Sequence, residues 1–228
     1  MRLSSKHLFE FDKSESQILI GTDEAGRGPG AGGVFASAVY FKSIGSELIE
    51  KLSCLNDSKK LSKKKREELF EIISLNTIHS TVCIEVEEIE KINILNASLK
   101  AMKIACENVI NEVKRQSRAG LPSRRHEADI LVLVDGNKNI KDFTYPQKFI
   151  IKGDGKSASI AAASILAKVS RDRYMQELDK KFPQYNWKQN AGYLTKEHLE
   201  AIEKYGITPI HRKSFLKGRN TKQLTLLN

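Results

Sequence analysis

Acidic residues directly follow apolar, strand-like segments, and this pattern limits the folds open to the chain. Residues 17–22 (QILIGT) precede Asp23 and Glu24, residues 130–134 (ILVLV) precede Asp135, and residues 149–151 (FII) come shortly before Asp154. A carboxylate just past a buried strand lies at the rim of a sheet, where α/β proteins commonly bind ligands. The pattern therefore predicts an α/β fold with carboxylates at its sheet rim. Whether these strand ends meet is open at this level.

Hydrophobic periodicity and capping residues predict the remaining elements. We expect further strands at 34–41 and 80–86, helices at 63–73, 93–114, 157–181 and 195–205, and a polar loop at 115–127. Small Ala and Ser side chains in the first half of the 157–181 helix would let it lie close against a sheet. The order of elements predicts an α/β domain over residues 1–180, with a mixed central sheet flanked by helices, and a helical C-terminal subdomain with a basic tail over 181–228.

Composition excludes several classes of protein. The chain has 228 residues, of which 40% are hydrophobic, so it can build a core and is not mostly disordered. No apolar segment approaches the roughly 20 residues of a membrane span. The N-terminus lacks an export signal, so we expect a cytoplasmic protein. Cys54, Cys83 and Cys106 are an odd number without C-x-x-C spacing, which argues against a disulfide framework or a zinc site.

Positive charge is concentrated in three segments of the chain. The formal net charge is +10, and residues 51–70, 114–125 and 211–228 together carry more than this excess, so the rest is slightly acidic. Such a distribution favours a polyanionic partner such as nucleic acid. Solvated lysine faces would give the same count, so charge alone leaves both interpretations open.

The strand-end carboxylates suggest a metal site. Carboxylates that converge repel one another unless a cation lies between them. Oxygen ligands suit Mg²⁺ or Mn²⁺, and two such ions roughly 4 Å apart can activate a water and stabilise the leaving oxygen of a phosphodiester. The candidate ligands are Asp23, Glu24, Asp135 and Asp154. A single strand-end Asp is more often an ordinary turn residue.

Asp172 competes with Asp154 as the fourth ligand. It lies inside the predicted 157–181 helix, about 22 Å from the helix start. An unbroken helix therefore prevents both residues from binding the same ions. We interpret Asp172, which stands between Arg171 and Arg173, as a structural ion-pair residue.

Two matches to phosphate-binding motifs are rejected. Residues 26–31 (GRGPGA) fit the dinucleotide fingerprint, but a strand rather than a helix is expected to follow. Residues 155–157 (GKS) look like the end of a P-loop, but Ile150 replaces the glycine that this loop requires.

Several motifs occur together along most of the chain. They are DEAGRGP at 23–29, NDSKKLS at 56–62, VDGN at 134–137, KGD at 152–154, KSASIAAASILAKV at 156–169, RDR at 171–173, GY at 192–193, TKEHL at 195–199 and PIHR at 209–212. In this combination and order they resemble ribonuclease HII, the type 2 ribonuclease H family, over about residues 18–215. The Gly26-Arg27-Gly28 motif also distinguishes the chain from type 3 relatives.

The resemblance implies a ribonuclease H-like fold and a specific activity. Members of this family cut the RNA strand of RNA–DNA hybrids and nick duplex DNA on the 5′ side of an embedded ribonucleotide, leaving a 3′-hydroxyl and a 5′-phosphate. The expected roles are ribonucleotide removal from DNA and RNA primer processing. The expected partner is an RNA–DNA hybrid or a DNA duplex with an embedded ribonucleotide, and the expected state is a monomer.

Residue roles follow from the same resemblance. The four carboxylates Asp23, Glu24, Asp135 and Asp154 would hold two divalent ions. Gly26, Arg27 and Gly28 would contact the 2′-hydroxyl and the adjacent phosphate, and Tyr193 would stack on the sugar of the following deoxynucleotide. The candidate phosphate contacts are Lys59, Lys60, Lys156, Lys168 and the tail that begins at Arg212. His211 is expected to be structural.

The chain departs from the family pattern in two segments. Gly30 and Gly33 replace an apolar residue and a proline, which predicts a looser first turn. Leu194 stands where Gly or Pro is usual, and Asn190-Ala191 replaces His-Lys. These changes leave the degree of preference for an RNA-to-DNA junction open.

Two other functions stay open. One is a basic hybrid-binding protein without catalysis, and the other is a metal nuclease that acts on DNA junctions. Four acids facing a phosphate would weaken binding unless metals neutralise them, which favours a nuclease over a binding protein. Residues 223–227 (QLTLL) leave a partner-binding tail open as well.

Overall fold

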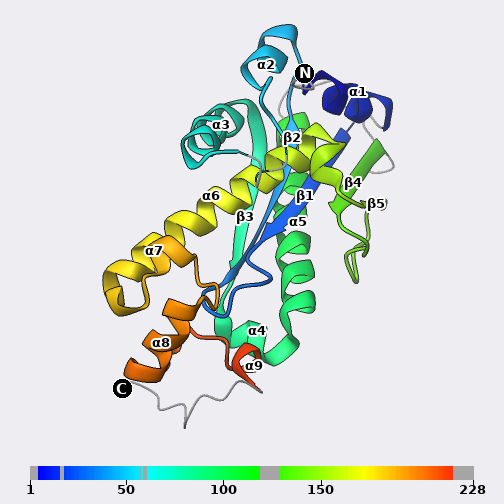
Figure 1. The fold of residues 1–228 in the computed structure, drawn as a ribbon. Coiled ribbons are helices and arrows are strands. Elements are labelled where there is room, and N and C mark those ends of the chain that lie inside the picture. Colours follow the sequence, from blue (N-terminus) through cyan, green and yellow to red (C-terminus); the bar gives the residue numbers. More distant parts are fainter. Residues whose placement is uncertain (1–4, 16–17, 57, 59–60, 119–128, 218–228) are drawn as a thin grey trace.

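A five-stranded mixed sheet forms the centre of the protein (Figure 1). The structure, a computed structural model, describes residues 5–217 except for 16–17, 57, 59–60 and 119–128. The strand order is β3-β2-β1-β4-β5. The strands are β1 (Ile18–Ala25), β2 (Val34–Phe41), β3 (Thr77–Ile84), β4 (Ile130–Asp135) and β5 (Gln147–Ile150). β1, β2 and β3 pair antiparallel, whereas β4 runs parallel to both β1 and β5.

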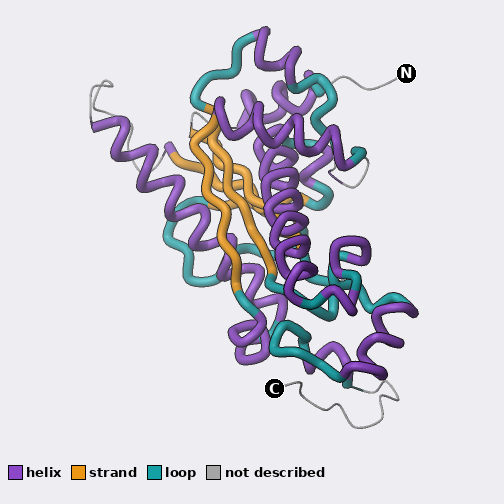
Figure 2. The backbone as a smooth tube through the Cα atoms, turned by 90° about the vertical axis from the view of Figure 1, so that its left-hand side faces the viewer, coloured by secondary structure: helices purple, strands orange, loops and turns teal. Residues whose placement is uncertain are grey.

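Long helices cover both faces of this sheet, as Figure 2 shows from the side. α5 (Ile94–Arg118) packs on β2 and β3, and α6 (Ala158–Lys181) crosses the opposite face over β1 and β2. Because side chains alternate along a strand, Ile20 of β1 enters the core beneath α5 while Leu19 packs with Ile160 of α6. This arrangement confirms the predicted mixed sheet flanked by helices.

The start of α6 lies in direct contact with the backbone of β1. A Cβ atom on Gly21 would lie 2.3 Å from backbone atoms of both Ser159 and Ile160. Asp12 of α1 (Lys6–Glu15) supports this helix start, since its carboxylate accepts a hydrogen bond from the backbone N–H of Ser159 at 2.8 Å. The small side chains in the first half of α6 therefore allow the close approach that the sequence predicted.

Shorter helices complete the fold. They are α2 (Ser46–Lys51), α3 (Lys63–Asn76), α4 (Val86–Ile92), α7 (Trp187–Asn190), α8 (Lys196–Tyr205) and α9 (Lys213–Leu216). Figure 1 shows α7 and α8 near the end of α6 and α9 beside α4. All three contribute to one apolar cluster, which contains Trp187, Ile202 and Leu216 together with Met175. Since Met175 belongs to α6, this cluster joins the C-terminal helices to the first domain, and the boundary near residue 180 stays a prediction.

Two predicted boundaries are wrong. β3 begins at Thr77 and ends at Ile84, not at 80–86, and Val86 instead begins α4. Acidic residues in the first turn of α4 favour a helix there, because they interact well with its positive end. α5 continues to Arg118, into the predicted loop at 115–127, most of which lies outside the described residues.

The prediction of a buried strand at residues 149–151 is right for Ile150, which is 8% exposed within β5, and wrong for its two neighbours. Phe149 is 45% exposed and Ile151 is 57% exposed. β5 is the edge strand of the sheet and covers only residues 147–150. An apolar segment at a sheet edge therefore gives the same sequence pattern as a central strand.

The cysteines and the helices of the described residues bear on two further expectations. Cys54, Cys83 and Cys106 are all free thiols. None of the helices in the described ranges is both long and apolar enough to span a membrane.

Gly21→Ser should destabilise the protein strongly. The new side chain would collide with the backbone of α6, and overpacking of this kind costs about 1–3 kcal/mol or more. Chemical denaturation measures the free energy of unfolding. Gly45→Ser is the matched control, because a Cβ atom there meets nothing within 4 Å and serine suits the N-cap of α2. Equal stability of the two variants would contradict the close contact.

Candidate active site

Asp23 and Asp135 lie close together because β1 and β4 are parallel neighbours, whose carboxyl-terminal ends lie at the same end of the sheet. The register pairs Thr22 with Val134, and each acid is the next residue in its strand. The prediction that Asp23 and Glu24 come after the strand is wrong, because β1 continues to Ala25 and pairs both residues with β2. Asp23 is only 5% exposed, and its burial raises the pKa of the carboxyl well above the usual value. The negative charges of Glu24 and Asp135 raise that pKa further. Three of the four predicted carboxylates therefore interact electrostatically.

The turn that carries Asp154 is attached to the end of β4. Asp154 lies in η3 (Gly153–Gly155), a short 3₁₀ helix just before α6. The backbone N–H of Gly153 donates to Asp135 Oδ1 at 2.6 Å. A Cβ atom on Gly153 would lie 2.5 Å from Ile160 Cδ1, so a larger residue would displace this turn. The fourth predicted carboxylate thus stands on a segment in contact with the third.

Local hydrogen bonds and ion pairs orient these side chains. Asp23 Oδ1 accepts a hydrogen bond from the backbone N–H of Glu24 at 2.7 Å. Glu24 Oε1 forms an ion pair with Arg27 Nη1 at 3.2 Å. Arg27 therefore connects the acidic strand end to the Gly26–Gly28 segment that follows it.

The donor set fits a hard divalent cation. Within the described part of the chain, no three or more His, Cys, Asp and Glu side chains form a metal-binding cluster. The carboxylate oxygens of Asp23, Glu24 and Asp135 are nevertheless the ligands that Mg²⁺ and Mn²⁺ prefer. Their mutual repulsion, which raises the pKa of Asp23, is the energetic cost that a bound cation offsets.

The loop after β1 brings the glycine motif against Tyr193. Gly26 has a φ of +102°, and a Cβ atom on it would lie 2.2 Å from Arg171 Nε, so only glycine fits. A Cβ atom on Gly28 would lie 3.3 Å from Cε1 of the Tyr193 ring. Tyr193 is 51% exposed. The structure therefore places the predicted 2′-hydroxyl contacts beside an aromatic ring that a ligand can reach.

Gly30 and Leu194 fit together in space. A Cβ atom on Gly30 would lie 2.6 Å from Leu194 Cγ, so the leucine side chain fills the space left by the glycine. The backbone N–H groups of Gly30 and Ala31 both donate to the carbonyl of Gly192, at 2.9 and 3.2 Å. This turn packs directly on the Tyr193 segment, and the expectation that it is looser than in relatives stays a prediction.

Arg171 joins the glycine loop to the Tyr193 segment, a role that the sequence analysis missed. Its guanidinium donates to the carbonyls of Ala31, Gly33 and Ala191 at 3.0–3.2 Å. Arg171 is 1% exposed and forms no ion pair with a carboxylate among the described residues. No sequence signal marked this role, because Arg171 stands among other charged residues in the second half of α6 and its partners are backbone carbonyls.

Arg212 holds the same loop from the C-terminal side. It is fully buried and donates to the carbonyls of Gly32 and Pro29, both at 2.9 Å. Burial lowers the pKa of its guanidinium to about 9, and the neighbouring Arg171 contributes to this shift. The prediction that the tail contacts phosphates from Arg212 onward is wrong for this residue, and residues 218–228 lie outside the described part.

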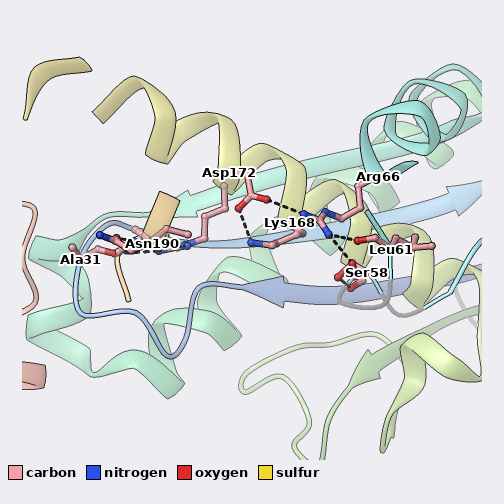
Figure 3. A network of polar contacts seen from close by, with 12 residues as sticks. Ala31, Ser58, Leu61, Arg66, Lys168, Asp172 and Asn190 are labelled. Atoms are coloured by element: carbon pink, nitrogen blue, oxygen red, sulfur yellow. Dashed lines mark hydrogen bonds and ion pairs between the residues drawn. The ribbon is translucent and has the colours of Figure 1, made fainter. Parts of the chain in front are cut away.

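Asp172 is a structural ion-pair residue, as predicted. Figure 3 shows its carboxylate between Lys168 of α6 and Arg66 of α3. Lys168 donates to Asp172 Oδ1 at 2.6 Å, and Arg66 lies 3.7 Å from Oδ2. Arg66 also donates to the carbonyls of Ser58 and Leu61, so the pair fixes the segment before α3.

A basic cleft lies beside this ion pair. Its volume is about 530 Å³, and its lining includes Lys63, Arg66, Lys168 and Lys188 against the single acid Asp172. The predicted phosphate contacts Lys59 and Lys60 lie outside the described residues. Arg66, which lines the cleft, donates to the carbonyls of Ser58 and Leu61.

Comparison with known proteins gives one consistent family. A model of the family described as Ribonuclease HII matches residues 20–218. Ribonuclease HII of Rickettsia akari (strain Hartford) is 49% identical over 209 residues, which cover 91% of this chain and 96% of that protein.

Solved structures agree with this match. Ribonuclease H2 from Pyrococcus horikoshii OT3 has a TM-score of 0.63 and 25% identity, covering 87% of this chain and 93% of that one. The ribonuclease HII in a PCNA complex from Archaeoglobus fulgidus has a TM-score of 0.62 and 26% identity, covering 91% and 98%.

His211 is buried and structural, as expected. It is 1% exposed, and its Nδ1 accepts a hydrogen bond from the backbone N–H of Thr208 at 2.9 Å. Burial, together with the neighbouring His198, lowers the pKa of His211 from 6.5 to about 3. The native state therefore keeps this ring neutral at pH values where the unfolded chain takes up a proton.

Protonation of His211 should make the protein less stable in acid. The stabilisation is complete above pH 6.5 and is lost as the pH falls towards 3. His211→Asn keeps an acceptor for Thr208 but cannot titrate. Its free energy of unfolding should approach that of the wild type by up to about 1.4 kcal/mol per pH unit below pH 6.5. Denaturant titrations from pH 7 to 4 measure this gap, and a constant gap would show that the native ring binds protons normally.

Proposed function

The chain belongs to the ribonuclease HII family, and on that basis we propose that it cuts the RNA strand of RNA–DNA hybrids and nicks duplex DNA on the 5′ side of an embedded ribonucleotide. The products carry a 3′-hydroxyl and a 5′-phosphate. The main support for the proposal is that the acidic residues and the glycine loop adjoin each other in the fold. Asp23, near the end of β1, and Asp135, the last residue of β4, lie at the same end of neighbouring strands, and Gly28 in the loop that leaves β1 lies against Tyr193.

The carboxylates form the reactive part of the proposed site. Asp23, Glu24, Asp135 and Asp154 would hold two divalent ions, Mg²⁺ or Mn²⁺, and these ions supply activation of a water and stabilisation of the leaving 3′ oxygen. The buried position of Asp23 and the Gly153 hydrogen bond to Asp135 fix the two strand-end carboxylates in place. The protein thereby orients its ligands before substrate binds.

The glycine loop and Tyr193 form the recognition part. Only the 2′-hydroxyl distinguishes a ribonucleotide from a deoxynucleotide, and it both donates and accepts hydrogen bonds. Gly26 and Gly28 allow the backbone to approach that sugar without interference from a Cβ atom. The exposed ring of Tyr193 beside Gly28 is placed to pack on the next sugar, where a second 2′-hydroxyl would fit less well.

The basic cleft supports binding of the nucleic-acid backbone. Its lysines and Arg66 outnumber Asp172, which suits contact with phosphates. Lys59, Lys60 and Lys156 are proposed to extend this contact. Phosphate contacts give affinity and register without choice of sequence, as an enzyme that acts at any embedded ribonucleotide requires. We propose that the protein acts in this way as a monomer.

Asp135→Asn should abolish nearly all cleavage and leave hybrid binding intact. The amide keeps an oxygen that can accept from Gly153 but removes the negative charge that a cation needs. Gel assays of a hybrid and of a duplex with one ribonucleotide measure cleavage, and fluorescence anisotropy measures binding. Asp142→Asn is the control, since Asp142 is exposed and its φ of +49° suits asparagine. Persistent cleavage by Asp135→Asn would show that the site is misassigned.

Tyr193→Ala should reduce cutting at single ribonucleotides by about ten- to a hundredfold, because the sugar next to the ribonucleotide loses its packing surface. The rate on a continuous hybrid should fall less. Tyr205→Ala is the matched control, since this tyrosine is 39% exposed and lies at the end of α8 that is farther from the Tyr193 segment. An unchanged rate at single ribonucleotides would remove the sensing role, and cleavage of all-DNA duplexes would favour a DNA nuclease instead.

A further inference from the structure

A buried histidine lies directly behind Tyr193. His198 of α8 is fully buried, and its Nδ1 lies 2.9 Å from the backbone carbonyl oxygen of Tyr193. Its Nε2 lies 3.0 Å from Trp187 Nε1 and 3.2 Å from Nε2 of His211. Both ring nitrogens of His198 therefore have partners in the interior of the protein.

The partners determine where each ring carries its proton. The indole N–H of Trp187 can only donate, so Nε2 of His198 accepts and its proton must reside on Nδ1. The backbone N–H of Thr208 donates to Nδ1 of His211, so the His211 proton resides on Nε2 and points at His198. Burial lowers the pKa of both rings, which keeps them neutral. His198 therefore donates from Nδ1 to the Tyr193 carbonyl.

This hydrogen bond completes the attachment of the Tyr193 backbone. The Tyr193 N–H donates to Asn190 at 2.9 Å, and its carbonyl also accepts from the N–H of Thr195 at 2.8 Å. Those two bonds lie within the same short segment, residues 190–195. His198 links the Tyr193 carbonyl to the buried side chains of Trp187 and His211. It therefore holds the Tyr193 backbone at a fixed position relative to these buried side chains.

We propose that His198 is a positioning residue that fixes the Tyr193 ring beside Gly28 and thereby sets the preference for a ribonucleotide followed by a deoxynucleotide. The inference rests on the proposed function. His198 touches neither substrate nor reacting atoms, and acts through the carbonyl of Tyr193. A small displacement of a positioned group lowers rate without loss of the fold, so the effect is expected in selectivity rather than in folding.

Proton–nitrogen correlation NMR of the histidine rings tests the premise without any activity measurement. The wild-type protein at pH 7 should show His198 protonated at Nδ1 and His211 protonated at Nε2, assigned by the loss of each signal in its substitution variant. A charged His198 ring, or one protonated at Nε2, would overturn the proposal.

Two substitutions at His198 separate its two hydrogen-bonding sides. His198→Asn places an amide near the Nδ1 position and can still donate to Tyr193. His198→Gln places its amide near the Nε2 position, so it keeps an acceptor for Trp187 but loses the donor to Tyr193. The ratio of kcat/KM for a single-ribonucleotide duplex to kcat/KM for a continuous hybrid should fall about tenfold in His198→Gln. It should stay near the wild-type value in His198→Asn.

Controls distinguish the possible failures. His7→Gln, on the exposed face of α1, should leave the ratio unchanged, and thermal unfolding reports the stability of each variant. Equal ratios in wild type, His198→Asn and His198→Gln would overturn the positioning role, as would equal losses in both variants. If the wild type itself does not nick the single-ribonucleotide duplex, the proposed function fails, while the NMR result still decides whether His198 holds Tyr193.

Discussion

The first turn of α6 touches β1 with no side chain between them, because Gly21 has none. This contact fixes the start of the helix, and η3, which carries Asp154, immediately precedes that start. The hydrogen bond from Gly153 to Asp135 then joins η3 to the end of β4. This close approach between α6 and β1 therefore helps to set the relative positions of β1, η3 and β4, the segments that carry Asp23, Asp154 and Asp135.

The proposed recognition surface depends on a second set of contacts, which involve backbone atoms. Arg171 and Arg212 bind carbonyl oxygens of the loop after β1, and His198 binds the carbonyl of Tyr193. Leu194 fills the space above Gly30. The C-terminal helices thus act as a support for the segments beside the strand ends, which explains why the glycine motif and Tyr193 meet although they are far apart in the chain.

The sequence predicts those features that depend on local pattern. Apolar runs followed by acids located the ends of β1 and β4, and the Ala- and Ser-rich segment gave the close packing of α6. Phe149 was misjudged because an edge strand and a central strand share the same apolar pattern. The roles of Arg171 and His198 were missed because their partners are backbone carbonyls, which carry no sequence signal. The contact between Gly30 and the Leu194 side chain likewise cannot be read from the sequence, because the two residues are far apart in the chain.

We propose that the acids of β1, β4 and η3 and the glycine loop form one metal-dependent site for ribonucleotides in duplex DNA. The most direct measurement incubates the wild-type protein with a DNA duplex that contains a single ribonucleotide, with Mg²⁺ or Mn²⁺ and with EDTA, and maps the ends of the products. The account predicts one nick on the 5′ side of the ribonucleotide that disappears with EDTA. Absence of any metal-dependent nick beside the ribonucleotide would contradict it.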